Sequence, residues 1–130
     1  MSALKRLGGA LNTLDRLAPS LGARAAFFAF CLPPPAFTRP DADRRFIARM
    51  QPILAEAEAI SIPAADGRIQ TYRWKTAKAE RAGTVLLVHG WTGQALVMAL
   101  FVKPLRDLGY DVVAIDLPAH GNSSGVQLNM

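Results

Sequence analysis

The sequence predicts an α/β fold in its second half: an antiparallel hairpin, then a parallel strand-helix-strand unit, preceded by amphipathic helices. Three observations support this prediction. Short runs of β-prone residues end in Gly-containing turns, an amphipathic segment separates the last two runs, and leucines recur at helical spacing near the amino terminus. The length of 130 residues is that of one modest domain. We therefore expect a small sheet with helices packed on it.

The amino-terminal segment is predicted to be an amphipathic helix. Leucines recur every three or four residues, at Leu4, Leu7, Leu11, Leu14 and Leu17. Lys5, Arg6 and Arg16 lie beside this stripe. Residues 1–51 contain eight Lys and Arg and three Asp, and the difference of +5 equals the net charge of the whole chain. Three interpretations stay open: packing on the rest of the protein, a weak membrane-surface contact through residues 1–17, and an Arg-rich transit peptide.

The segment from Ala25 to Leu32 is strongly apolar but short. Arg24 and the run Pro33-Pro34-Pro35 bound it within eight residues, which is too few to cross a bilayer. The prolines predict a stiff linker. The single cysteine, Cys31, excludes an intramolecular disulfide and fits a reducing compartment, so we predict a cytoplasmic protein.

A further helix is predicted before the first strand. Its apolar residues recur at helical spacing, at Phe46, Ile47, Met50, Ile53 and Leu54. We expect this helix to cover the hairpin that follows. Residues 1–57 are therefore assigned to a helical amino-terminal extension, and residues 58–130 to a partial α/β core.

Four strands are predicted. Ile60 to Pro63 and Ile69 to Trp74 flank the turn signal Ala65-Asp66-Gly67, which predicts an antiparallel hairpin. Thr84 to His89 and Asp111 to Ile115 are separated by a helix, and a right-handed crossover makes these two strands parallel.

The crossover helix carries its own start and stop signals. Thr92 is predicted to cap its start, and Gly109 stands where a helix usually ends. We expect a kink at Pro104 and an apolar face made of Val97, Phe101, Leu105 and Leu108.

Composition bears on the function class. Two histidines thirty-one residues apart and one cysteine match no zinc-binding spacing, so no metal is predicted. No cofactor is predicted either. Nucleic acid is not an expected partner, because the basic residues lie on amphipathic helices without an aromatic stacking platform. A nucleotide site near Asp116 would need G-x-G-x-x-G, which the sequence does not supply.

Two motifs follow the last two strands. His89-Gly90-Trp91-Thr92-Gly93 has the form H-G-x-x-G, and Asp116-Leu117-Pro118-Ala119-His120-Gly121-Asn122-Ser123 is close to D-x-P-G-H-G-x-S. Together they resemble the α/β-hydrolase superfamily, in its esterase, lipase and serine-peptidase-like branch. The similar stretch covers roughly residues 58 to 128. The motifs depart from the family at Ala119, where a glycine is usual, so we expect a less tight turn there.

The resemblance implies a site and a sheet order. The backbone N–H of Trp91 would donate to an oxyanion hole, while His89 and Gly90 would shape the loop. The substrate would be a small molecule with an ester, thioester or amide bond. The family's strand order is first, second, fourth, third, which puts the strand Val85 to Val88 at an edge of the predicted sheet.

The catalytic triad is not found in the sequence. Gly121-Asn122-Ser123-Ser124-Gly125 fits G-x-S-x-G, but a nucleophile elbow needs a strand directly before the serine and a helix after it. Neither an acid nor a histidine follows Ser123. A full sheet of this family needs about eight strands, so we expect the amino-terminal part of a serine hydrolase that ends before the elbow and is inactive alone. The alternative is a non-catalytic remnant or a small interaction protein.

Overall fold

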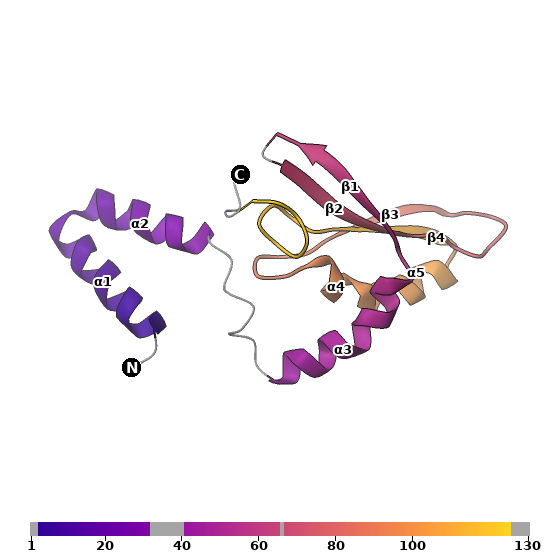
Figure 1. Cartoon of the computed structure of the whole chain (residues 1–130), viewed down its shortest axis with the longest axis horizontal. Helices are drawn as coiled ribbons and strands as arrows, with labels where there is room; N and C mark the ends of the chain where they lie inside the picture. Colours follow the sequence, from indigo (N-terminus) through magenta and orange to yellow (C-terminus); the bar gives the residue numbers. More distant parts are fainter. Residues whose placement is uncertain (1–2, 32–40, 66, 126–130) are drawn as a thin grey trace. The chain divides into compact units, whose positions relative to one another are not determined.

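The computed structural model describes residues 3–31, 41–65 and 67–125, and it divides the chain into two compact units, Met1–Leu32 and Pro33–Met130 (Figure 1). The predicted linker Pro33-Pro34-Pro35, residue Asp66 of the turn signal and the side chain of Leu4 lie outside the described residues.

The first unit is a helical hairpin. Helix α1 (Ala3–Leu17) and helix α2 (Pro19–Cys31) are joined at Ala18, whose N–H still donates to Leu14 O. The helices approach closely at Gly22, where a Cβ would stand 2.6 Å from the Asp15 Cα. The predicted amphipathic helix is therefore present, and glycine allows the second helix to pack on it.

The second unit contains a four-stranded sheet in the order β1-β2-β4-β3, as predicted. Strands β1 (Glu58–Ala64) and β2 (Gly67–Trp74) form the antiparallel hairpin. Strand β4 (Tyr110–Ile115) lies antiparallel to β2 and parallel to β3 (Gly83–Val88), which is at the edge. This arrangement is a partial α/β fold.

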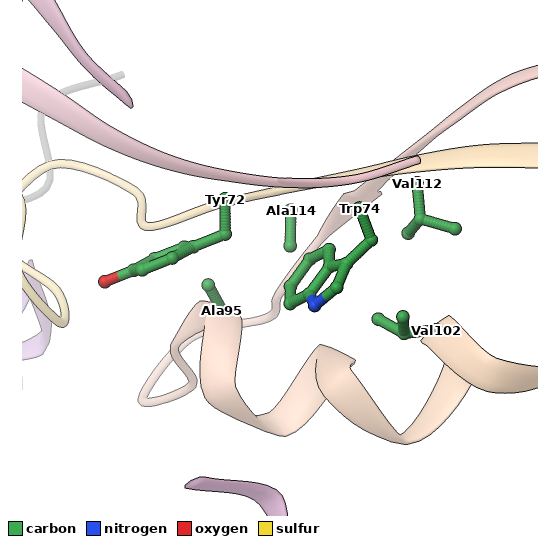
Figure 2. Packing of buried hydrophobic residues seen from close by; sticks show 6 residues of the cluster. All are labelled: Tyr72, Trp74, Ala95, Val102, Val112 and Ala114. Atoms are coloured by element: carbon green, nitrogen blue, oxygen red, sulfur yellow. The ribbon is translucent and has the colours of Figure 1, made fainter. Parts of the chain in front are cut away.

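One face of the sheet carries the core. Helix α4 (Ala95–Met98), the 3₁₀ turn η2 (Ala99–Phe101) and helix α5 (Val102–Asp107) run across it. Figure 2 shows aromatic and small side chains of β2 and β4 facing this helical layer. The buried cluster consists of Tyr72, Trp74, Ala95, Val102, Val112 and Ala114.

Helix α3 (Asp41–Ala55) belongs to the same compact unit as the sheet, so the division of the chain differs from the predicted boundary at residues 57 and 58. The indole N–H of Trp74 donates to Ile53 O at 2.8 Å, and Ile53 and Leu54 pack against the core cluster. The helix contacts α4 and η2 more than the hairpin it was expected to cover. Its apolar stripe therefore completes the helical layer.

The crossover helix buries a face that matches the predicted one only in part. Leu105 packs against the core cluster and Val97 is half-buried, as expected. Ala95, Leu96, Ala99 and Val102 are buried, whereas Phe101 and Leu108 are about half to two-thirds exposed, at 48% and 65%. The α-helical pattern breaks into a 3₁₀ turn at residues 99–101, one turn before Pro104, whose ring would crowd the carbonyl four residues earlier. Because a 3₁₀ turn has fewer residues per turn than an α-helix, the side chains that follow this break are rotated around the helix axis. The helix ends as expected at Gly109, with φ 96°.

The edge strand exposes apolar side chains. Leu86 and Val88 on β3 are 58% and 50% exposed, and Ile62 on β1 is 48% exposed. The register places Leu86 beside Val113 and Val88 beside Ile115. Because side chains alternate across a strand, these residues share the face opposite the core. That face of the described sheet is apolar and partly open.

A buried carboxylate fixes the other end of the sheet. Asp111 accepts the Thr76 N–H at 2.9 Å and pairs with Arg73 at 3.2 Å and with Arg81. The Thr76 N–H holds the pKa of Asp111 below its usual value; burial opposes this shift, and the two guanidinium groups add to it. The start of β4 is thereby tied to the connection that follows β2.

This carboxylate makes stability dependent on pH. A lowered folded-state pKa gives stability that is full above the unfolded value of about 3.9 and is lost as the pH falls through the folded value. We expect Asp111→Asn to lower the urea midpoint at pH 7 and to flatten the loss of stability between about pH 5 and pH 2. Asp107→Asn, at an exposed carboxylate that pairs with Lys103, is the control. An unchanged acid profile in Asp111→Asn would contradict this role.

Candidate active site

The loops that follow β3 and β4 meet at one edge of the sheet. Both strands are parallel neighbours, so their carboxyl ends lie side by side, which is where open α/β sheets bind ligands. The first loop begins at His89 and the second at Asp116. Both residues are almost fully buried, at 3% and 2% exposure.

His89 connects the two loops. Its Nε2 accepts the Leu117 N–H at 3.0 Å, so the ring proton is on Nδ1, which donates to Gly90 O at 2.8 Å. Its ring also lies 5.1 Å from the ring of His120. With both nitrogens bonded to backbone groups, His89 positions the Gly90–Gly93 turn.

The turn after β3 is strained. Gly93 N–H donates to Gly90 O at 2.9 Å, closing a β-turn with Trp91 and Thr92 in its centre. Thr92 has φ 66°, a left-handed conformation that suits glycine and is unusual for a β-branched residue. A strained backbone at a strand's carboxyl end is typical of ligand-binding loops.

Asp116 fixes the start of the crossover helix. Its Oδ1 accepts the Ala95 N–H at 2.6 Å, and its Oδ2 accepts the Asn122 N–H at 2.9 Å and the Tyr72 hydroxyl at 3.4 Å. The residue before the helix, Gln94, makes no side-chain capping bond. The predicted cap at Thr92 is therefore wrong. A carboxylate from the next strand takes this role, because an anion is stabilised by the N–H groups of a helix start.

Tyr72 is hydrogen-bonded to both Asp116 and Asn122. Its hydroxyl accepts a hydrogen bond from Asn122 Nδ2 at 2.7 Å and donates to Asp116. Burial raises the pKa of the Tyr72 hydroxyl, the bond from Asn122 lowers it in part, and the carboxylate of Asp116 raises it further. Tyr72 therefore keeps its proton and remains a donor at neutral pH.

The loop after β4 turns with the help of residues that have a positive φ, among them Ala119 and Gly121. Gly121 has φ 52°, and a Cβ there would overlap the Asp116 carboxylate. Ala119 has φ 64°, so the alanine keeps the left-handed turn geometry that we expected it to loosen. The turn is held by Ala119 N–H donating to Ser124 O at 3.0 Å. Surrounding hydrogen bonds thus impose a conformation that glycine would adopt more easily.

Ser123 is held by backbone groups. Its hydroxyl donates to Asp116 O at 2.6 Å and accepts the Gln70 N–H at 2.8 Å. Its proton is therefore directed at a carbonyl rather than at a base. The G-x-S-x-G match at this position describes a loop anchor on β2 and not a nucleophile elbow.

A cleft of about 310 Å³ opens beside the β3 loop. One wall is the turn from His89 to Gly93, and the others are apolar side chains of α3 and α4. Those side chains are Phe46, Ile47, Val97 and Met98. A larger hollow of about 590 Å³ is lined by α3, α5 and residues 77–78, with none from the two motif loops. The smaller cleft is therefore the candidate site.

Part of the chain is similar to solved structures of hydrolases. Solved structures similar to the chain include a thioesterase domain from the curacin biosynthetic pathway, with 32% identity over 53% of this chain and 24% of that one, at a TM-score of 0.45. An epoxide hydrolase from an endophytic Streptomyces has 26% identity over 53% and 19% of the two chains, at 0.44. A Pyrobaculum calidifontis esterase has 22% identity over 65% and 32%, at 0.44. The chain spans about a fifth to a third of these structures.

No family model and no curated protein matches the chain. Within residues 3–31, 41–65 and 67–125, no group of three His, Cys, Asp or Glu side chains could hold a metal ion. Of the predicted site residues, His89, Gly90 and Trp91 all line the cleft.

Three residues have roles in this site that the sequence did not predict. Asp116 was predicted only as the first residue of the second motif and as a position near which a nucleotide site would lack its glycines, although its place at the end of a strand was a signal for a buried loop anchor. Phe46 and Ile47 were expected on a helix over the hairpin, and nothing in their local pattern indicates that they line the cleft.

The requirement for glycine at position 121 can be tested. Gly121→Ala would place a methyl group on the Asp116 carboxylate and hold alanine at a positive φ, so we expect a loss of at least about 2 kcal/mol in the free energy of unfolding. Fluorescence of the buried Trp74 in urea measures it. Gly90→Ala is the control, because a Cβ there meets nothing within 4 Å. Equal effects of the two variants would contradict the clash.

Replacing the alanine at position 119 by glycine is expected to raise the free energy of unfolding, the opposite of the effect expected for Gly121→Ala. Ala119→Gly removes the cost of a left-handed alanine, about 1–2 kcal/mol, but adds chain entropy to the unfolded state. We expect a net gain of up to about 1 kcal/mol by the same urea titration. Ala114→Gly, at a buried strand position, should instead destabilise the fold. A loss of stability in Ala119→Gly would show that the turn is not strained.

Proposed function

We propose that this chain is the amino-terminal part of a serine hydrolase acting on an ester, thioester or amide bond, and that it contributes the oxyanion-hole loop. The observation that carries the proposal is the apolar cleft beside the strained turn from Gly90 to Gly93, at the carboxyl end of β3. The nucleophile, acid and base of the triad would come from outside residues 1–130.

The chemistry of acyl transfer supports this role. Attack on a carbonyl builds negative charge on its oxygen, and a removed oxyanion donor costs about 3–4 kcal/mol in other enzymes. We assign one such donor to the backbone N–H of Trp91, which lines the cleft. His89 and Asp116 hold the loops on either side of this turn, so the donor is positioned before substrate binds.

The cleft indicates the substrate class. Phe46, Ile47, Val97 and Met98 give it apolar walls, and its volume of about 310 Å³ is at the small end of ligand sites. An acyl group of moderate length would fill it. The carbonyl oxygen of such a group would then lie against the turn.

A non-catalytic interaction protein is the second candidate. The observation that favours it is the exposure of Leu86, Val88 and Ile62 on the sheet face opposite the core, because exposed apolar side chains gathered on one face mark an interaction surface. In that case the cleft would have no acyl ligand.

Binding of a carboxylate with an apolar tail separates these candidates. In ¹⁵N-labelled protein, octanoate should shift the backbone amide signals of Gly90 to Gly93, since its carboxylate resembles the oxyanion and its chain fills the cleft. Octyltrimethylammonium, with the same tail and the opposite charge, should leave these signals in place. Equal shifts with both ligands, or none with octanoate, would overturn the proposed oxyanion loop.

The cleft wall gives a variant test. Ile47→Ala removes apolar contact with the octanoate chain, so we expect the dissociation constant to rise about fivefold. Leu100→Ala is the matched control, because Leu100 is exposed and does not line the cleft. Equal dissociation constants for wild type and Ile47→Ala would place the ligand elsewhere.

Catalysis by the chain alone gives a further expected outcome. Residues 1–130 should hydrolyse p-nitrophenyl esters no faster than their Ser123→Ala variant, because the Ser123 hydroxyl donates to a carbonyl. Rapid fluorophosphonate labelling of Ser123 would show instead that it is an activated nucleophile.

A further inference from the structure

The helical hairpin of α1 and α2 exposes an apolar surface. The inner face of α2 is made of small residues, with Gly22 buried and Ala25 and Ala29 half-buried. Its outer positions carry large apolar side chains. Leu21, Phe27 and Phe28 are 56%, 60% and 54% exposed. Large apolar side chains at neighbouring exposed positions mark an interaction surface.

Exposed basic residues occur on both helices of this hairpin. Lys5, Arg6, Arg16 and Arg24 are all exposed, and Asp15 is the one acidic residue between positions 5 and 31. Arg24 precedes Phe27 and Phe28 by three and four residues, so the three side chains lie on one side of the helix. The long stem of an arginine can lie along apolar surface while its guanidinium reaches a polar layer.

We propose that the α1–α2 hairpin binds an anionic lipid surface, with Leu21, Phe27 and Phe28 entering the boundary between headgroups and acyl chains. Aromatic and aliphatic groups next to basic residues match the chemistry of that boundary. The helices have 15 and 13 residues, so each is about 20 Å long and suits binding along the surface. No helix among the described residues is long and apolar enough to cross a membrane.

Vesicle flotation with the whole chain tests this surface. We expect the protein to float with phosphatidylcholine vesicles that contain about 30% phosphatidylserine, and at least about tenfold less with phosphatidylcholine alone. Raising the salt from about 0.1 M to about 0.5 M should release most of it, because screening weakens the attraction of the basic residues. Equal binding to both vesicle types, or binding to neither, would overturn the proposal.

Two variants separate the apolar and basic parts. The double variant Phe27→Ser, Phe28→Ser should reduce binding to anionic vesicles at least about tenfold, and Arg16→Gln with Arg24→Gln should reduce it severalfold. Leu86→Ser and Arg68→Gln change an exposed apolar and an exposed basic residue of the sheet unit, and should leave binding unchanged. Circular dichroism checks that helix content is retained.

The competing occupant is a second copy of the chain. Sedimentation equilibrium without lipid distinguishes it: we expect the wild type and the double phenylalanine variant to have the same mass. A wild-type dimer that the variant abolishes, together with unchanged vesicle binding, would assign the apolar surface to self-association and overturn the lipid proposal.

Discussion

The buried carboxylate of Asp116 is the interaction on which the candidate site depends. It accepts hydrogen bonds from the start of α4, from the loop after β4 and from Tyr72 on β2. A buried anion is costly unless N–H and O–H groups surround it, and each donor left without it would lose about 1–3 kcal/mol. The hydrogen bonds to this carboxylate can therefore form only when three segments, distant in sequence, meet at the edge of the sheet.

The strained residues follow from that constraint. Both loops must turn within a few residues to bring their N–H groups to Asp116 and His89, and left-handed backbone conformations achieve this at Thr92, Ala119 and Gly121. Strain of about 1–3 kcal/mol persists only where other contacts over-determine the backbone. Here those contacts are hydrogen bonds between backbone and buried side chains. The backbone conformation of the turn beside the cleft is thus a consequence of the hydrogen bonds that hold the two loops together.

The sequence predicts those features of the fold that depend on neighbouring residues or on the handedness of the strand-helix-strand crossover. The hairpin, the parallel pairing of the last two strands and the glycine stop at Gly109 follow from short patterns and the crossover rule, whereas the strand order was implied only by the resemblance to the α/β-hydrolase family. The helix start could not be predicted in this way, because its N–H partner is Asp116, twenty-one residues after Ala95. The buried residues of the crossover helix were also predicted only in part. A 3₁₀ turn before Pro104 changes the helical periodicity on which that prediction relied.

The placement of α3 shows why the cleft cannot be inferred from the motifs alone. The motifs supply the turn and its supports, but Phe46 and Ile47 supply an apolar wall from a helix that precedes the sheet. That helix is tied to the core by the bond from Trp74 Nε1 to Ile53 O and by the packing of Ile53 and Leu54. A shift of α3 would leave the turn intact while changing the shape of the cleft. In the proposed function, the backbone donor and the apolar wall of the cleft are therefore supplied by separate segments.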